Sequence, residues 1–180
     1  MRSPGWSGAA AALAIGLSAC GDARQAAAPD VRKFLAAVAG DDRMAFEARI
    51  DRPAVRADLK GQLLAVPEVR ALQDQLGDDT GDVAADKMIS PESFRLLRVG
   101  AGQLPGKSAS AHEIAGRLRV LAPERVCLRD ETARDRCLLT FARQGGAWKL
   151  VALHAPDVTT RALKDIQVST SLPPAEGEAD

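Results

Sequence analysis

The sequence predicts an α+β fold, in which N-terminal helices pack on one face of a C-terminal antiparallel sheet. Between residues 30 and 97, apolar side chains recur every three or four positions, which is the period of an amphipathic helix. Between residues 125 and 153, short apolar runs are separated by turn residues, as in antiparallel strands. Helices that precede the strands, instead of alternating with them, indicate an α+β arrangement.

The first nineteen residues have the organisation of a secretory signal peptide. Arg2 supplies a positive charge, and residues 5–19 contain no charged side chain. This run is shorter than the roughly 20 apolar residues that span a bilayer, and it has the size of a signal-peptide core. It ends in residues 17–20 (LSAC), which resemble the lipobox of bacterial lipoproteins: an apolar residue, two small residues and the cysteine that receives the lipid.

The resemblance implies that cleavage before Cys20 leaves an acylated cysteine, which anchors the chain to a membrane and places the domain in the periplasm. Acyl chains hold a protein stably because each buried CH₂ contributes about 0.8 kcal/mol. Gly21, not Asp, follows the cysteine, which favours the outer membrane over the inner, whereas Asp22 weakens that preference. An ordinary cleaved signal with a chance cysteine, and an uncleaved membrane helix, are the alternatives.

After the signal peptide, the chain is long enough for one domain with a modest core. Residues 20–29 are expected to form a tether, residues 30–156 a single α+β domain, and residues 157–180 an extension that is largely disordered after residue 171. Helices are predicted over residues 30–39, 43–50, 53–67 and 83–89, and from Pro91 onward. Asp30 is the expected N-cap of the first helix, and Pro53 suits the first turn of the third. Turn-rich breaks are expected at residues 77–82 and 100–111.

The C-terminal half predicts a hairpin around Gln144-Gly145-Gly146. Glycine tolerates the positive φ angles of tight hairpin turns, and residues 138–143 and 147–153 flank this one as strands. With that turn, Phe141 lies opposite Leu150, and Arg143 lies opposite Trp148.

The two cysteines that remain after lipidation, Cys127 and Cys137, predict one disulfide. An even number of thiols in an exported protein indicates a disulfide framework. A hairpin centred on Thr132 would place the two cysteines opposite each other on neighbouring strands. A redox site or half a metal site is the alternative, although the pair has neither CxxC spacing nor histidine support nearby.

The composition excludes several classes of partner. The formal net charge is zero, so no strong field draws the chain to nucleic acid. Tyrosine is absent and aromatic residues make up 3% of the chain, which argues against stacking platforms for single strands and against an aromatic sugar cleft. Residues 101–108 (AGQLPGKS) end like a P-loop, but Ala101 replaces its first glycine and no buried strand precedes it. We therefore expect a linker there, with no nucleic-acid partner and no cofactor.

Three basic residues form a candidate anion or partner patch. Arg52, Arg56 and Lys60 fall four positions apart, so they share one helix face that suits a lipid headgroup or another anion. The alternative, which we favour, is a solvated face paired with nearby acids such as Glu47, Asp51 or Asp58.

No residues are assigned to catalysis or to a metal. His112 and His154 are the only histidines and lack the HExxH spacing, and His154 is expected to be a surface or capping residue. The mature chain contains no GxSxG motif.

Four segments carry a resemblance to a bacterial family, domain of unknown function 2939 (DUF2939). They lie within a region of similarity from about residue 30 to residue 156, and they depart from the family pattern at Arg52, where an aromatic or apolar residue is expected. The resemblance implies a curved helix-on-sheet fold of the NTF2-like or cystatin-like group, and no known activity. The segments are residues 34–42 (FLAAVAGDD), 50–60 (IDRPAVRADLK), 89–92 (ISPE) and 139–150 (LTFARQGGAWKL).

Two functions follow as hypotheses. The first is a membrane-anchored, non-catalytic module that binds a small ligand or an envelope protein; an accessory of envelope assembly is a variant of it. The second is a small NTF2-like enzyme, in which Asp51, Arg56 or His154 would converge in a deep apolar pocket between helices and sheet.

Overall fold

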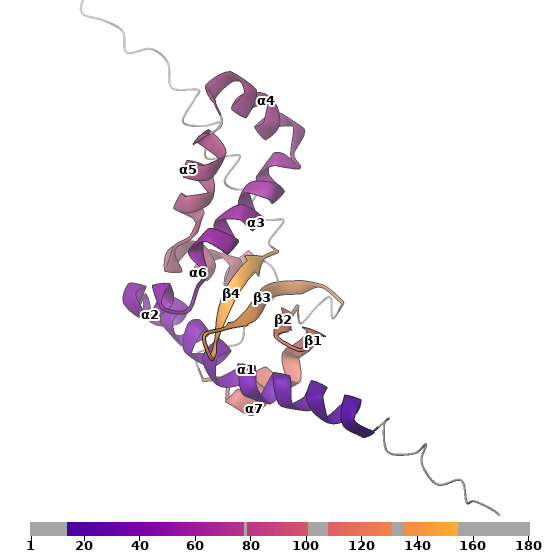
Figure 1. The fold of residues 1–180 in the computed structure, drawn as a ribbon. Helices are drawn as coiled ribbons and strands as arrows, with labels where there is room; N and C mark the ends of the chain where they lie inside the picture. The colour runs from indigo at the N-terminus through magenta and orange to yellow at the C-terminus, as the bar shows by residue number, and fades with distance from the viewer. Residues whose placement is uncertain (1–13, 78, 101–107, 131–134, 155–180) are drawn as a thin grey trace, which may run out of the picture.

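Helices precede a single antiparallel sheet, which confirms the predicted α+β fold. The computed structural model describes residues 14–77, 79–100, 108–130 and 135–154 (Figure 1). Within them, the sheet has the strand order β1-β2-β3-β4, and every neighbouring pair is antiparallel. The elements are α1 (Ala14–Gly40), α2 (Arg43–Glu47), α3 (Arg52–Leu64), α4 (Pro67–Leu76), α5 (Asp79–Met88), α6 (Pro91–Gly100), α7 (Ala111–Arg117), β1 (Leu118–Ala122), β2 (Arg125–Arg129), β3 (Cys137–Gln144) and β4 (Ala147–Leu153).

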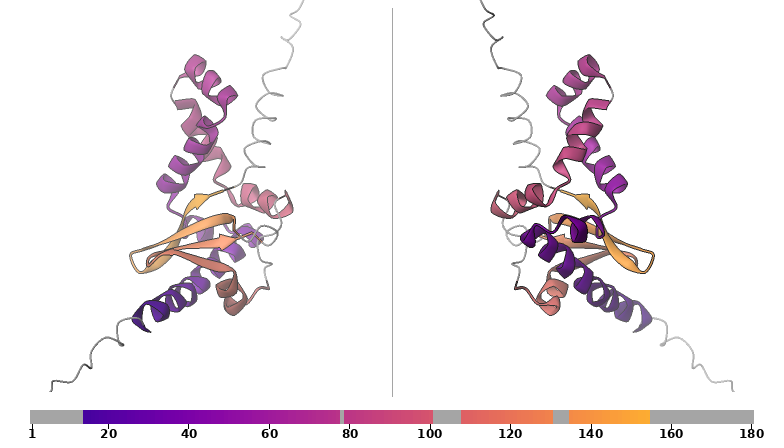
Figure 2. Two further views of the ribbon diagram at one scale, coloured as in Figure 1. Left: turned by 90° about the vertical axis from the view of Figure 1, so that its right-hand side faces the viewer. Right: turned by 90° about the vertical axis from the view of Figure 1, so that its left-hand side faces the viewer.

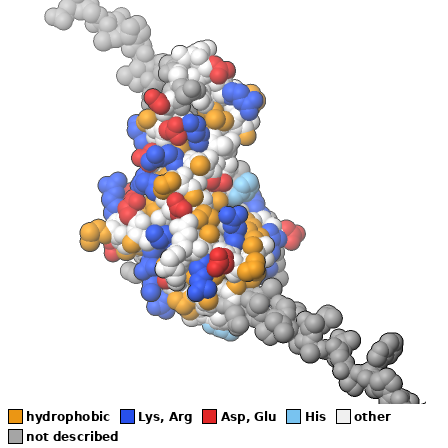
Figure 3. Space-filling model, in the orientation of Figure 1, with side chains coloured by type: hydrophobic (Ala, Val, Ile, Leu, Met, Phe, Trp, Pro, Cys, Tyr) orange, Lys and Arg blue, Asp and Glu red, His pale blue; other side chains and the backbone are white. Residues whose placement is uncertain are grey.

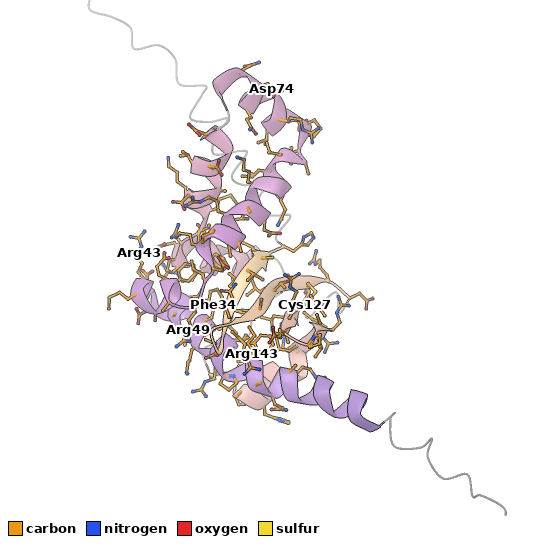
Figure 4. All side chains as sticks on the ribbon, in the orientation of Figure 1. Phe34, Arg43, Arg49, Asp74, Cys127 and Arg143 are labelled. Carbon is orange, nitrogen blue, oxygen red and sulfur yellow. A yellow bond between two sulfur atoms is a disulfide. The ribbon has the colours of Figure 1, made fainter. Side chains whose placement is uncertain are left out.

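The core lies between α1 and one face of the sheet. All four phenylalanines of the chain meet there, with ring centroids 5.3 to 5.6 Å apart, and Phe34 of α1 contacts the other three. Figure 4 shows Phe34 where α1 passes the sheet. Three of the four pairs are edge-to-face or nearly so, the geometry that the charge distribution of aromatic rings prefers. The helical layer is thus joined to the sheet through α1, which supplies Phe34, and β3, which supplies Phe141.

The structure corrects the expected tether over residues 20–29, because α1 runs through it. Ala23, Ala27 and Ala28 are buried, and α1 packs closely against α7 and β1. Alanine has the highest helix propensity, and its small side chain lets two helices approach closely. Asp30 therefore is not an N-cap; its carboxylate instead accepts a hydrogen bond from the backbone N–H of Trp148 at 3.0 Å.

The outer edge of β4 is covered by side chains and backbone from the helical half. The Leu150 amide donates to the carbonyl of Arg49 at 2.9 Å, and the Asp51 amide donates back to the Leu150 carbonyl at 2.8 Å. Further along, the Leu153 amide donates to Asp58 of α3 at 3.0 Å. An uncovered edge strand invites pairing with other chains, so these bonds both fix α3 beside the sheet and protect β4.

The predicted β3–β4 hairpin is confirmed in turn and register. Phe141 pairs with Leu150 and Arg143 with Trp148. Gly145 and Gly146 have φ angles of 57° and 85°, which L-residues with side chains rarely adopt.

Helices α3, α4 and α5 form an arm that projects away from the sheet. They pack on one another, and all views place α4 at the far end of the molecule from the start of α1 (Figures 1 and 2). Pro67 begins α4 after α3 ends at Leu64, as the ring's fixed φ predicts. The expected break at 77–82 is shorter than predicted, because residues 79–82 already form the first turn of α5.

Helix α7 and strand β1 were not predicted from the sequence. A capping box begins α7: the Ser110 hydroxyl accepts from the Glu113 amide, and the Glu113 carboxylate accepts from the Ser110 amide. Most of the expected 100–111 linker, and the C-terminal extension after residue 154, lie outside the described residues.

Candidate functional site

A groove of about 420 Å³ lies on the sheet face opposite α1, between the sheet and α3. Strand alternation builds its floor. Arg119 pairs with Cys127, Cys127 with Thr140 and Thr140 with Ala152, so these four residues form one row across the four strands. The groove is lined by Asp58, Gln62, Arg119, Arg136, Cys137, Thr140, Ala152, Leu153 and His154.

The same alternation places apolar residues on the core side. The adjacent row, Leu118, Leu128, Leu139 and Leu153, is buried at 2% exposure or less. A strand residue and its neighbour point to opposite faces, so the leucine row fixes which side chains reach the groove.

Cys127 and Cys137 are joined across β2 and β3, with sulfurs 2.02 Å apart and Cα atoms 5.6 Å apart. The register differs from the expected one. Cys127 pairs with Thr140, and Cys137 pairs with Arg129, and an irregularity between Leu128 and Arg129 shifts the ladder by one residue. The bond therefore runs diagonally on the groove face; Thr132, the expected turn centre, lies outside the described residues.

Two arginines, Arg119 and Arg136, line the groove on the side of the sheet. Arg119 is exposed, and its Nη2 lies 3.4 Å from the Cys137 sulfur. Arg136 binds the buried carboxylate of Asp130 through both Nε and Nη2, and its carbonyl accepts from the Asp130 amide at 3.0 Å. Burial of an unpaired carboxylate is costly, so Asp130 fixes the position of Arg136 at the groove.

The opposite wall comes from α3 and the end of β4. The Asp58 carboxylate accepts from the Gln62 side chain at 2.8 Å as well as from the Leu153 amide, while Gln62 also donates to the Leu153 carbonyl. His154 is exposed, and its amide donates to the Leu138 carbonyl at 2.9 Å. The groove thus presents guanidinium, carboxylate, hydroxyl, amide and imidazole groups beside the apolar Ala152 and Leu153, a set that can bind and orient a small polar ligand.

The candidate patch Arg52, Arg56 and Lys60 does share one face of α3, but acids neutralise it. Arg52 bonds Glu47 at 2.5 Å and Asp86 at 2.7 Å; Arg56 bonds the same Asp86 oxygen at 2.6 Å. Lys60 lies 2.7 Å from Asp82. The favoured alternative of a paired face is therefore supported, although two of the three partners come from α5 and were not foreseen.

These ion pairs line the contact between α3 and α5, which we call the α3 seam, and they shift the pKa values of Asp86 and Arg52. Hydrogen bonds from Arg56 and Arg52 hold the pKa of Asp86 below its usual value. The hydrogen bond to Glu47, with support from Asp86, raises the pKa of Arg52. Arg52 also donates to the carbonyl of Ile89, which gives this departure from the family pattern a structural role.

The groups considered for an enzyme do not converge. Asp51 caps α3 and accepts from Gln144 at 2.6 Å, Arg56 binds Asp86, and His154 lies at the groove. His112 is exposed on α7, and within the described ranges no group of three or more His, Cys, Asp or Glu side chains is placed to hold a metal.

Cys20 lies within the backbone of α1, and its side chain is not described. No helix in the described part of the chain is long and apolar enough to cross a membrane. Gly106 and Lys107 of the P-loop-like segment lie outside the described residues.

The fold and groove define an α+β domain with a polar site on the open sheet face. Residues 19–97 match the family model described as "Protein of unknown function (DUF2939)", which confirms the resemblance over that part of the chain. The match contains α2 to α5 and ends before α7 and the sheet, whereas the similarity was expected to continue to about residue 156. No curated protein and no solved structure matches the chain, so the NTF2-like or cystatin-like assignment stays a prediction.

The sequence analysis did not identify most of the residues that line the groove. Arg119 lies on the unpredicted strand β1, and Asp58 and Gln62 come from a helix whose placement beside β4 depends on contacts 91 to 95 residues apart. Thr140 had a signal, because it alternates with Leu139 and Phe141 in a predicted strand.

Proposed function

We propose that this protein is an envelope lipoprotein, attached to a membrane through acylated Cys20 and facing the periplasm, with a non-catalytic binding module as its domain. The observations that carry the proposal are the lipobox-like residues 17–20 (LSAC), which follow an uncharged run of signal-peptide length, and the Cys127–Cys137 disulfide.

The Cys127–Cys137 disulfide supports an exported location, because such bonds persist in oxidising compartments and are rare in the cytosol. The binding role is supported by the groove, which gathers side chains from α3, β1, β3 and β4 on a sheet face that α1 leaves open. Its ligand would be a small polar molecule or a polar segment of an envelope protein.

Intact-mass analysis of the membrane fraction, under non-reducing conditions, tests the anchor. Wild type should begin at Cys20 with added acyl mass and should lack two hydrogens at the disulfide. The Cys20→Ala variant should keep its first nineteen residues. A wild type that is soluble and free of lipid would overturn the anchor.

A photo-reactive residue tests the groove. Placed at Thr140 in the membrane-bound protein, it should give an adduct of defined mass in cells. Ala142 is the matched control, since it lies two residues along the same strand face and outside the groove lining. Equal adducts at both positions, or none at Thr140, would contradict the binding role.

A further inference from the structure

The groove on the open sheet face is lined by two opposite charges that the fold leaves available. Arg119 of β1 is exposed and forms no ion pair with any residue that the structure describes. Asp58 of α3 accepts hydrogen bonds from Gln62 and from the Leu153 amide through a single oxygen, Oδ2. Its other oxygen, Oδ1, accepts none from the described residues. The groove can therefore offer one positive and one negative charge to a ligand.

The remaining charge in the groove lining is already neutralised. Arg136 binds the fully buried Asp130 carboxylate through both Nε and Nη2. Arg119 and Asp58 are then the charges left to a ligand, and their sum is zero. In Figure 3, basic side chains and a histidine, in blue and pale blue, lie together where the arm meets the sheet. Because charges across an interface match in sign and position, the fitting ligand carries both charges and no net charge.

The strand order sets the distance between the two charges. Arg119 Nη2 lies 3.4 Å from the sulfur of Cys137 on β3, so this guanidinium reaches across β2. Asp58 lies at the outer edge of β4, where it accepts from the Leu153 amide. Neighbouring strands are about 4.8 Å apart, so the two charges are separated across the sheet by roughly 10 Å, or about two strand spacings. An extended peptide of about three residues has the same length.

Polar groups without partners lie between the two charges. Thr140 and Ala152, paired on β3 and β4, form the floor there, and His154 follows at the end of β4. The Thr140 hydroxyl and the His154 imidazole form no hydrogen bond with the described residues. Both groups can donate to or accept from the amide groups of a bound peptide. The small side chain of Ala152 lets a peptide backbone approach the sheet.

We infer that the groove binds a short zwitterionic peptide of about three residues, with its terminal carboxylate at Arg119 and its terminal ammonium group at Asp58. The inference rests on the proposed function, in which the groove is the binding site. The planar guanidinium fork matches a carboxylate, and the free oxygen of Asp58 matches an ammonium donor. Recognition of both ends distinguishes a free peptide from an internal segment of a protein, which has neither terminal charge.

Titration calorimetry with trialanine tests the ligand class. The protein is purified in detergent in the form that cells produce, with its disulfide intact. Trialanine is the probe because recognition of the two ends does not depend on side chains. Trialanine amide lacks the carboxylate, and N-acetyl-trialanine lacks the ammonium group. Each blocked form should bind about tenfold more weakly than trialanine or worse, because each loses a hydrogen bond between charged groups.

Two variants assign the ends of the peptide. Arg119→Gln should lower the affinity for trialanine about tenfold and should bind trialanine and its amide equally. Arg125→Gln makes the same change in charge at an exposed position of β2 outside the groove lining, and should keep the wild-type affinity. Asp58→Asn should bind trialanine and its N-acetyl form equally. Asp58 also binds β4, so thermal unfolding checks this variant; if it does not fold, Arg119→Gln still decides the test.

The outcomes separate this inference from the proposed function. If the photo-reactive residue at Thr140 gives no adduct, the binding role fails and this inference fails with it. If the adduct forms but trialanine does not bind, or if its blocked forms bind as tightly as trialanine, only the ligand class is wrong. Equal losses of affinity in Arg119→Gln and Arg125→Gln would overturn the placement of the carboxylate at Arg119.

Discussion

Helices α1 and α3 both carry basic side chains, yet the fold surrounds those side chains differently. On α3, Arg52, Arg56 and Lys60 bind acids of α2 and α5, so the face is a seam inside the molecule. On α1, Arg32 lies exposed and forms no ion pair with any residue that the structure describes. The spacing of cations along a helix shows which of them share a face. Acids on other elements, such as Asp82 and Asp86 of α5, decide whether the charge of those cations is available to a partner.

The largest effect is expected on the buried side of α1. Phe34→Ala removes the ring that contacts the three other phenylalanines and should lower the free energy of unfolding by about 3–5 kcal/mol. Urea denaturation measures the loss. Ala36→Ser, on the exposed side, is the control and should change stability by less than about 0.5 kcal/mol. Equal effects would mean that α1 is a tether after all.

The second prediction sets the two cationic faces against each other. Arg52→Ala breaks its bonds to Glu47, Asp86 and the Ile89 carbonyl, and should cost about 2 kcal/mol. Arg32→Ala removes no intramolecular bond and should stay within about 0.5 kcal/mol of wild type. Thermal unfolding compares the two variants, and a larger loss for Arg32→Ala would invert our interpretation of the faces.

Acid should weaken the α3 seam specifically. The pKa of Asp86 is lower in the folded than in the unfolded chain, because Arg56 and Arg52 bind its carboxylate. Its stabilisation is therefore present above the ordinary pKa of 3.8 and is lost as pH falls through the lower folded value. Urea midpoints should fall less steeply below pH 3.8 in Asp86→Asn than in wild type; parallel curves would show that the seam does not depend on this charge.

Salt should have the smallest effect. The seam pairs are partly exposed, so raising NaCl to about 1 M should lower wild-type stability by less than about 1 kcal/mol. The Arg52→Ala variant should lose less than wild type on the same addition, because part of the seam is already broken. Arg32→Ala should follow wild type, and a distinct salt response there would reveal an intramolecular pair that involves α1.

Several parts of the fold followed from local pattern. The β3–β4 register could be predicted because two adjacent glycines define a short turn, and a turn of known length sets every pair that follows. The start of α3 likewise followed from Asp51 and Pro53, a cap and a first-turn proline. By contrast, α1 was predicted to begin at Asp30, because proline and aspartate usually mark a helix start; burial of the alanines before them outweighed that signal.

The candidate site was less predictable, since its residues come together through long-range contacts. Thr140 and the cysteines lay in predicted strands, but the β2–β3 register differs from the expected one, and Cys127 faces Thr140 instead of Cys137. Asp58 was treated as a partner for basic residues on its own helix; in the structure it binds the Leu153 amide and forms a groove wall.

The sequence by itself determined the signal-like N-terminus, the α+β class and the pairing of the two cysteines, because each depends on composition, period or a short separation along the chain. Only the tertiary structure decided that α1 extends through the expected tether, that β4 is capped by Asp30, Arg49 and Asp58, and which cations remain exposed. Those outcomes depend on contacts between segments far apart in the chain. The burial of apolar surface brings such segments together, and no local pattern specifies where they meet.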